Sequence, residues 1–173
     1  YLYLAWSIAS EKHSCPVAVG SETSIWQYDC AQIVISTLNP NDSKNLDNAL
    51  CWSGSPSGTG TTAYDWNVEI GIAVNDDGDT LLCKNWFSNN LEFEGSASRN
   101  DDTATTVYEV KIPLSALNTE CPGYETTFES GTQLGVSFSI NTNDGITRVV
   151  RLRDGGGIYG SNDMSKVPCI TLE

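Results

Sequence analysis

Basic side chains are scarce in this chain of 173 residues, which has 9 lysines and arginines, 22 aspartates and glutamates, and a net charge of −13. Binding to the phosphate backbone of DNA or RNA needs clustered lysine and arginine, so we expect no nucleic-acid partner. The sequence also lacks any run of about 18 apolar residues and therefore predicts no membrane span. The charge suits a neutral ligand, a cation or simple solubility.

Histidine and methionine occur once each, as His13 and Met164. A catalytic pair of serine or cysteine with histidine would have to use His13, which lies in a predicted loop. Pairs of carboxylates always occur among 22 acidic residues, so their presence does not indicate a glycosidase. No Cys-x-x-Cys pair is present, which disfavours a zinc site. The sequence therefore favours a protein that is not an enzyme.

The six cysteines are spread over the chain, and their even number fits up to three disulfides in an oxidising compartment. The alternative is a set of buried free thiols. Asn41-Asp42-Ser43 is a sequon for N-glycosylation, which also suits secretion. We therefore expect a secreted, extracellular glycoprotein, with the disulfide pairing left open. The candidate disulfide residues are Cys15, Cys30, Cys51, Cys83, Cys121 and Cys169.

Alternation of apolar and polar residues is most regular over 105–112, where Tyr108, Val110 and Ile112 share one face. Pro113 lacks an N–H group and ends this strand, and the residues after it favour a short helical turn. Antiparallel hairpins at this spacing predict a single β-sandwich domain over residues 1–173. The other predicted strands are 1–9, 25–38, 63–74, 80–87, 91–98, 132–140, 146–152 and 167–172, with hairpin turns at 75–79 and 141–145 and a long loop at 39–62.

The chain begins inside a predicted strand, Tyr1–Ile8. Chain termini usually carry some slack outside regular structure. We therefore expect a segment upstream of Tyr1, which would be a cleaved leader, further residues of the same domain or a preceding domain.

Five stretches together resemble the carbohydrate-binding modules of family 9 and their DOMON-like relatives. Trp26–Ile33 resembles the family's W-x-x-D-x-x-[EQ]-[IVF] strand, and Tyr108–Leu114 resembles its Y-E-x-x-I-P strand. The remaining stretches, which match in the family's order, are Tyr1–Leu4, Gly135–Gly145 and Gly157–Leu172. The resemblance implies an all-β, antiparallel β-sandwich of the immunoglobulin-like or DOMON-like jelly-roll type. It also implies a strand or two before Tyr1 and a non-catalytic domain that binds oligo- or polysaccharide.

Two aromatic rings clamp the saccharide in sugar-binding members of that family. The resemblance assigns one position to Trp26 and the other to Tyr159 in the last loop. Trp52 is a further candidate because it lies in a loop rich in glycine and serine, where an aromatic side chain is often functional. Gln32, which replaces the family's glutamate, and Arg148 are the expected hydrogen-bond partners of sugar hydroxyls. A solvated strand face is the competing interpretation of Arg148.

Calcium is a second candidate ligand. Asp76, Asp77 and Asp79 lie in one predicted turn, and Asn143 and Asp144 in another, so several oxygens come close together as a hard cation requires. The competing interpretation is ordinary hairpin-turn chemistry. The resemblance adds that family members often carry structural calcium. Some DOMON relatives bind haem through methionine and histidine, but with one of each in predicted loops we expect no haem here.

Two functions stay open at this point. The first is a carbohydrate-binding module that is linked to a catalytic domain or released from a larger extracellular protein. The second is a structural or assembly subunit of a fibre or surface layer. In that case copies of the sandwich would exchange strands at an open sheet edge.

Overall fold

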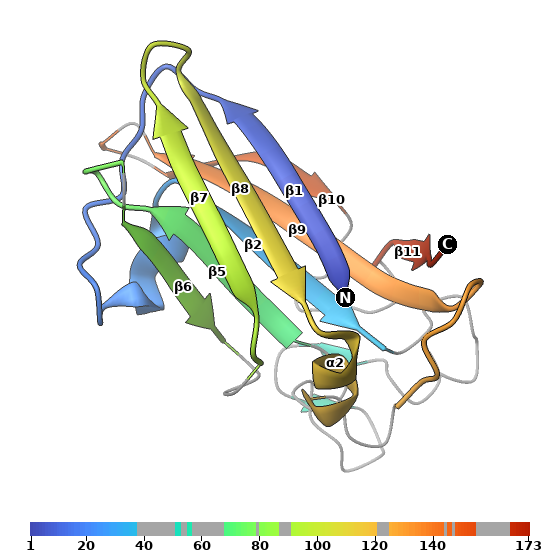
Figure 1. The fold of residues 1–173 in the computed structure, drawn as a ribbon. Helices are drawn as coiled ribbons and strands as arrows, with labels where there is room; N and C mark the ends of the chain where they lie inside the picture. The colour runs from blue at the N-terminus through green and yellow to red at the C-terminus, as the bar shows by residue number, and fades with distance from the viewer. Residues whose placement is uncertain are drawn as a thin grey trace.

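A computed structural model gives the fold of the chain (Figure 1). It describes residues 1–37, 68–78, 80–86, 91–120, 125–143, 145–146 and 167–173 with their side chains, and residues 51–52, 55–56 and 148–154 by their backbone alone. The elements in these ranges are β1 (Leu2–Ala9), the 3-10 helix η1 (Glu22–Gln27), β2 (Cys30–Ser36), β3 (Cys51–Trp52), β4 (Ser55–Pro56), β5 (Val68–Val74), β6 (Leu81–Asn85), β7 (Glu94–Asn100), β8 (Thr105–Ile112), α2 (Leu114–Glu120), β9 (Gln133–Asn143), β10 (Arg148–Asp154) and β11 (Cys169–Thr171).

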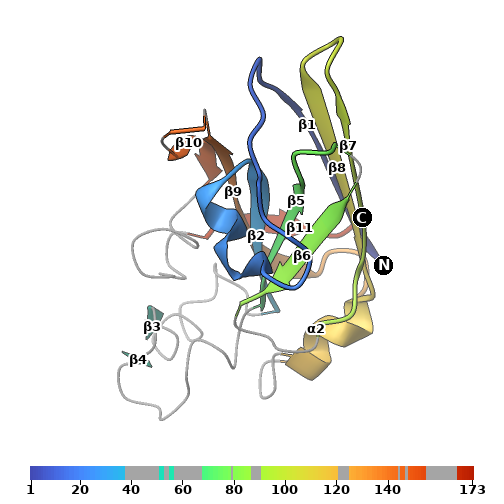
Figure 2. The same ribbon diagram turned by 90° about the vertical axis from the view of Figure 1, so that its left-hand side faces the viewer.

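Two antiparallel sheets make up the body of the protein. One has three strands in the order β1–β8–β7. The other has six strands along the path β10–β9–β2–β5–β6, with β11 paired to the beginning of β9. Figure 2 shows the sheets from the side, with β1, β7 and β8 on one side and β9, β10 and η1 on the other. The predicted all-β sandwich is therefore confirmed.

The hydrophobic core lies between these sheets. On β8, Tyr108, Val110 and Ile112 are buried, as their alternation predicts, and they meet the inward residues Ile33 of β2 and Ile70 of β5. Burying one such side chain contributes roughly 1.5–3 kcal/mol. The core fixes the register of β2, β5 and β8, because a shift by one residue would turn these side chains to the opposite face.

The helix α2 follows β8 directly and closes one end of the sandwich (Figure 1). Its Leu117 is completely buried and joins the core. Pro113 stands just before it, as expected for a residue that ends a strand and suits a first helical turn. Among the described residues, no helix is long and apolar enough to cross a membrane.

Several sequence-based boundaries were wrong. The strand expected over 91–98 runs from Glu94 to Asn100, and the one expected over 146–152 runs from Arg148 to Asp154. The strand expected over 25–38 begins at Cys30, and the 3-10 helix η1 occupies the residues before it. The strand β9 continues through Asn143 into the predicted turn at 141–145, because it keeps pairing with β10 there. The predicted loop over 39–62 contains the two-residue strands β3 and β4. Local alternation could not reveal the start of β2 or the end of β9, which depend on partners distant in the sequence, and β3 and β4 are too short to show alternation.

Candidate functional site

Trp26 is a large apolar side chain that keeps 39% of its surface exposed. Its neighbour in η1, Ile25, is fully buried and packs beside Trp86 over Gly71. Successive side chains of a 3-10 helix point about 120° apart, because the helix has three residues per turn. Burial of Ile25 therefore turns Trp26 toward the outside of the protein.

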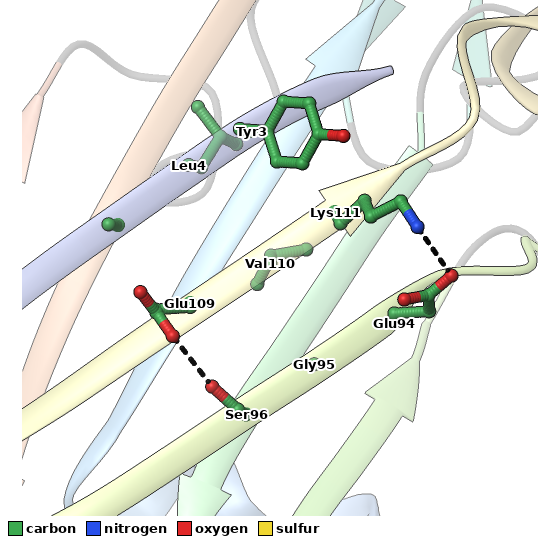
Figure 3. Close-up of a pocket in the computed structure, with 9 residues that line it drawn as sticks. Tyr3, Leu4, Glu94, Gly95, Ser96, Glu109, Val110 and Lys111 are labelled. Carbon is green, nitrogen blue, oxygen red and sulfur yellow. Dashed lines mark hydrogen bonds and ion pairs between the residues drawn. The ribbon is translucent and has the colours of Figure 1, made fainter.

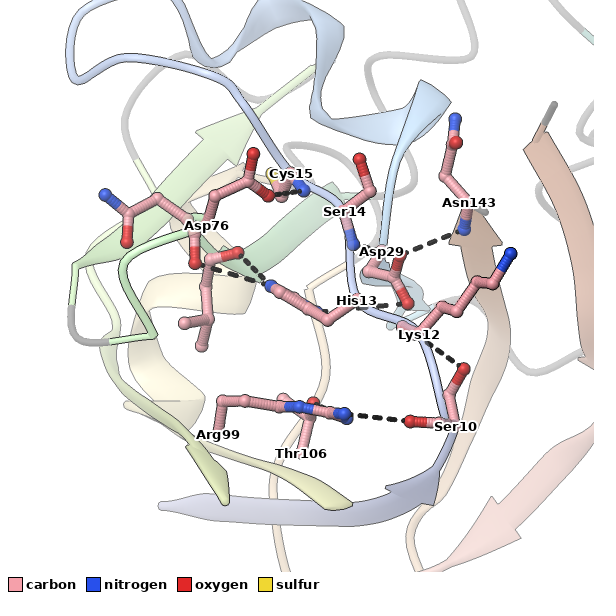
Figure 4. Close-up of polar contacts among 12 residues, drawn as sticks. Ser10, Lys12, His13, Ser14, Cys15, Asp29, Asp76, Arg99, Thr106 and Asn143 are labelled. Atoms are coloured by element: carbon pink, nitrogen blue, oxygen red, sulfur yellow. Dashed lines mark hydrogen bonds and ion pairs between the residues drawn. The ribbon is translucent and has the colours of Figure 1, made fainter. Parts of the chain in front are cut away.

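The carboxylate of Asp29 fixes the chain just after η1 (Figure 4). Its Oδ2 atom accepts hydrogen bonds from the backbone N–H groups of Ser14 and Asn143, each at 2.9 Å. The side-chain amide of Asn143 donates to the carbonyl of Gln27 at 2.8 Å. These bonds join η1, the loop before it and the end of β9. The backbone beside Trp26 is therefore held from both sides.

His13 is the only histidine of the chain and contributes to the same cluster. Its side chain is 8% exposed; Nε2 lies 3.0 Å from the carbonyl oxygen of Val74, and Nδ1 lies 4.0 Å from Oδ1 of Asp29. Burial raises the pKa of Asp29, and the N–H groups that bind this carboxylate act in the opposite direction. Nε2 of His13 and the carboxylate of Asp29 thus both bind the backbone, while the buried Nδ1 of His13 has no hydrogen-bond partner in the described structure.

A buried polar network lies on the face of the larger sheet that points away from the core. Gln32 donates from Nε2 to Glu69 at 3.1 Å and accepts at Oε1 from the amide of Asn141 at 2.6 Å. The hydroxyl of Ser139 adds a further hydrogen bond to this network, donating from Oγ to Oδ1 of Asn141 at 3.4 Å. Burial raises the pKa of Glu69 to about 7, opposed in part by the hydrogen bond from Gln32. Gln32 thus uses both ends of its amide inside the protein, and a ligand would have to replace one of these bonds.

The other residues expected to bind sugar are less fully described. Arg148 opens β10 and pairs with Asn143, so its backbone lies at the end of the sheet where η1 is attached. Trp52 is described by its backbone in β3, and Tyr159 lies outside the described residues. The structure therefore brings Trp26 and the backbone of Arg148 to the same end of the molecule. The roles of Trp52 and Tyr159 stay predictions.

The turn after β5 contains two of the carboxylates that suit calcium. Asp76 accepts a hydrogen bond from the backbone N–H of Cys15, and Asp77 accepts one from the side chain of Asn75 at 2.9 Å. Gly78 has a φ of +80°, a conformation that favours glycine and that this turn requires. Asp77 thus takes part in the contacts of an ordinary turn, while Asp76 joins this turn to the loop that contains Cys15.

The second calcium candidate lies at the end of β9. The side-chain oxygen of Asn143 accepts the N–H of Gly145 at 2.7 Å, while its amide nitrogen donates to Gln27. Asp79 and Asp144 lie outside the described residues. Within the described ranges, no group of three or more histidine, cysteine, aspartate or glutamate side chains is placed to hold a metal ion. Calcium binding stays a prediction.

Two of the candidate disulfide residues carry free thiols, the buried Cys15 and the exposed Cys83. Burial raises the pKa of the Cys15 thiol to about 11, which makes it unreactive at neutral pH. The side chains of Cys51 and Cys121 and the sequon at Asn41 lie outside what the structure describes. The structure forms no disulfide through Cys15 or Cys83, while the pairing of the remaining cysteines and the glycan stay predictions.

Sequence reasoning did not identify Glu69 or Asn141 as partners of Gln32. Glu69 is the only charged residue of β5, whose other residues are valine, isoleucine, glycine and alanine. A lone charge in such a strand indicates either an exposed position or a buried polar contact, and only the pairing of β2 with β5 and β9 decides between them. Asp29, the aspartate of the W-x-x-D motif, was a sequence signal that could have indicated this cluster. Its carboxylate holds the chain just after η1.

Comparison with models of known protein families finds no match to the chain, and comparison with curated proteins finds no similar sequence.

Proposed function

We propose that this chain is a non-catalytic domain that binds carbohydrate against the indole of Trp26. The observation that carries the proposal is the partly exposed ring on a segment held by hydrogen bonds from two sides. A flat aromatic face packs well against the C–H groups of a sugar ring. Because the backbone beside the ring is already fixed, little ordering has to accompany binding.

Other groups at this end of the larger sheet would complete the site. Arg148, which pairs with Asn143, would donate hydrogen bonds to sugar hydroxyls. Tyr159 would supply a second ring, as the family resemblance suggests, and Trp52, from the loop rich in glycine and serine, would supply a third. The network through Gln32 would support the sheet beneath the ligand. Structural calcium and a covalently linked catalytic domain belong to the same proposal.

Binding without catalysis is supported by the way the ionisable groups near Trp26 are used. His13 is buried against a backbone carbonyl, and Asp29 accepts two backbone N–H groups. Neither is placed to exchange a proton with a sugar at the surface. The net charge of −13 favours a neutral glycan over an anionic one, and we propose that the protein works in the extracellular space.

A glycan-array screen tests this proposal, run once with calcium and once with chelator. We expect Trp26→Ala to lower the signal on the bound glycans at least tenfold, because it removes the stacking surface. Trp26→Phe keeps a ring and should retain part of the signal. Val19→Ala is the matched control, since it shortens another exposed apolar side chain. Full binding by a folded Trp26→Ala protein would rule out the site.

A second candidate function, assembly through a sheet edge, is favoured by the composition of β1. This strand of eight residues has no charged residue and no proline, and among the described strands it pairs only with β8. Natural edge strands usually carry such residues, which prevent pairing with other chains. An unprotected edge suits addition of a strand from another copy.

Light scattering at several protein concentrations tests assembly. If β1 pairs with another copy, the wild-type protein should form dimers or larger species, and Ser7→Lys should restore the monomer by placing a charge on the edge strand. Ser7 is exposed, so the lysine disturbs no core contact. A wild-type protein that is monomeric at the highest concentration would contradict this function.

A further inference from the structure

A groove of about 380 Å³ lies on the outer face of the three-stranded sheet (Figure 3). Its floor includes the backbone of Leu4 and Val110, whose side chains point into the core. The outward side chains that line it come from all three strands. They are Tyr3 and Ala5 of β1, Glu109 and Lys111 of β8, and Glu94 and Ser96 of β7.

The groove follows from strand register. In one cross-strand row Tyr3 lies opposite Lys111, which in turn lies opposite Glu94. In the next row on the same face Ala5, Glu109 and Ser96 take these places. Ala5 and Ser96 are small, so the second row leaves a hollow beside the long side chains of the first. Residues two apart on a strand share a face, which makes one continuous lining from the two rows.

The charged groups of the groove are held by neighbours. Lys111 donates from Nζ to Glu94 at 2.8 Å, and Ser96 donates from Oγ to Oε2 of Glu109 at 3.0 Å (Figure 3). The ammonium of Lys111 also lies 4.4 Å from the ring centre of Tyr1. The opposite charges of Lys111 and Glu94 neutralise each other. The other carboxylate oxygen of Glu109 points away from Ser96, toward β1 (Figure 3).

Aromatic surface completes the lining. Tyr3 is 68% exposed and lies beside the hollow over Ala5, and Tyr1 has its ring centre 6.2 Å from that of Tyr3. A half-open groove with an exposed ring, small side chains and ordered polar groups has the composition of a ligand site. Its size is at the lower end for small-molecule pockets, which suits a short stretch of a polymer.

We propose that this groove is a second carbohydrate-binding site, in which a sugar ring lies over Ala5 against the ring of Tyr3 and donates a hydroxyl to Glu109. The groove offers acceptors on the free oxygen of Glu109 and on the hydroxyl oxygen of Ser96, and donors on the ammonium of Lys111, which has N–H groups beyond the one bound to Glu94. A hydroxyl group uses both kinds, whereas a cation would use only the acceptors. The ligand class rests on the function proposed above, but the site uses none of the residues around Trp26.

The groove and Trp26 lie on opposite sides of the domain. The groove lies on the three-stranded sheet, while η1 with Trp26 lies on the side of the six-stranded sheet (Figure 2). One domain with sites on opposite sides can hold two glycan chains or two parts of one chain. Because the two sites face opposite ways, they would link separate glycan chains rather than raise the apparent affinity for a single glycan surface.

The test is a glycan-array screen of four folded proteins: wild type, Trp26→Ala, Tyr3→Ala and the double variant. We expect each single variant to keep a measurable signal and the double variant to lose at least a further fivefold. Glu109→Gln should behave as Tyr3→Ala, and Tyr3→Phe, which keeps the ring, should stay near wild type. Val107→Ala is the control because it shortens an exposed side chain on the same sheet outside the groove.

The outcomes separate the two sites. If Tyr3→Ala binds as wild type and Trp26→Ala alone removes all signal, the groove is not a sugar site and the site at Trp26 stands. If Tyr3→Ala removes the signal and Trp26→Ala does not, the groove is supported and the site at Trp26 is excluded. A folded wild-type protein that binds no glycan on the array overturns both.

Discussion

At the scale of single residues, Glu69 combines a carboxyl group with a buried position. It is 6% exposed, and its hydrogen bond comes from the amide of Gln32. Burial disfavours the charged form, which raises the pKa to about 7. In the folded protein this carboxyl group therefore keeps its proton to a higher pH than in the unfolded chain, and stability depends on pH in a defined direction.

The first prediction concerns Glu69→Gln. Between pH of about 4.5 and 7 the folded state binds more protons at this site than the unfolded state, so the stabilisation is complete at low pH and is lost as pH rises through about 7. The glutamine side chain of the variant cannot ionise and still offers an oxygen to Gln32. The variant's free energy of unfolding should exceed that of wild type by up to about 3 kcal/mol at pH 8. The two proteins should agree near pH 4.5.

Urea denaturation of both proteins at several pH values measures this difference. Other titrating groups, including Asp29, are present in both proteins and cancel in the comparison. Two curves of stability against pH that run parallel from pH 4.5 to 8 would show that Glu69 ionises normally.

The second prediction concerns Gly71, which lies directly beneath Trp86. A Cβ atom at this position would collide with the indole ring and come within 3.2 Å of Ile25. Gly71→Ala should therefore lower the free energy of unfolding by roughly 1–3 kcal/mol, the usual range for overpacking. The double variant Gly71→Ala with Trp86→Leu should be less destabilised than the sum of the two single changes. Strict additivity in thermal and urea unfolding would argue against the contact.

At the scale of elements, η1 depends on Asp29 more than on its own sequence. The helix has no side-chain N-cap bond, and the bonds around Asp29 hold the chain that follows it. A six-residue 3-10 helix has little stability alone, so its position follows from these tertiary contacts and from the burial of Ile25.

The third prediction is that Asp29→Ala loosens η1 without unfolding the sandwich. It leaves the backbone N–H groups of Ser14 and Asn143 without their acceptor, which costs about 2–4 kcal/mol for the two. Hydrogen exchange followed by NMR should show faster exchange at these two amides and little change in β8. Asp29→Asn keeps a side-chain oxygen and should lose less. If these two amides exchange as slowly in Asp29→Ala as in wild type, Asp29 does not hold η1 in place.

Alternation in the sequence predicted some of these elements and not others. The alternation over 105–112 predicted β8 and its buried face correctly, because each side of that strand meets a uniform environment. The helix η1 was missed because tertiary contacts define it, namely the hydrogen bonds around Asp29 and the packing of Ile25 against Trp86 and Gly71. The partners of Gln32 were missed for a related reason. Glu69 and Asn141 lie on neighbouring strands, and strand order in a sheet cannot be read from alternation.

The same distinction applies to the candidate sites. Trp26 was assigned to the site by resemblance; the structure shows its side chain partly exposed, and its role stays a prediction. The groove was not predicted, although Tyr3, Glu109 and Lys111 were all assigned to strands. Two strands that are far apart in the sequence, β1 and β8, must pair in one register before these side chains meet. Composition carries no information about that register.

At the scale of the whole molecule, negative charge dominates. The chain has 22 acidic and 9 basic side chains, so carboxylates far outnumber the groups that could neutralise them. Among the described residues, lysine and arginine pair with carboxylates at Lys111–Glu94 and Arg99–Asp101. Mutual repulsion of the surplus carboxylates opposes the compact state and is weakened by salt.

The fourth prediction is that added salt stabilises the protein. Raising sodium chloride from about 20 mM to about 500 mM shortens the screening length from roughly 20 Å to about 4 Å. A gain of about 1 kcal/mol would raise the melting temperature by roughly 2–4 °C for a domain of this size. Differential scanning calorimetry at a pH of about 7.5, where the carboxylates are charged, measures the shift. A melting temperature that falls with salt would show that attractive ion pairs outweigh the repulsion.

The pairing of β2 with β9 at the centre of the larger sheet also determines when the protein is able to fold. Cys30 and Asn141, which meet across this pair, are 111 residues apart in the sequence. A ribosome must therefore produce most of the chain before β2 finds its neighbour. Until then β2 exposes a hydrophobic strand with an open edge, a state prone to aggregation. Contacts of such long range also place the folding time in the millisecond-to-second range of all-β domains.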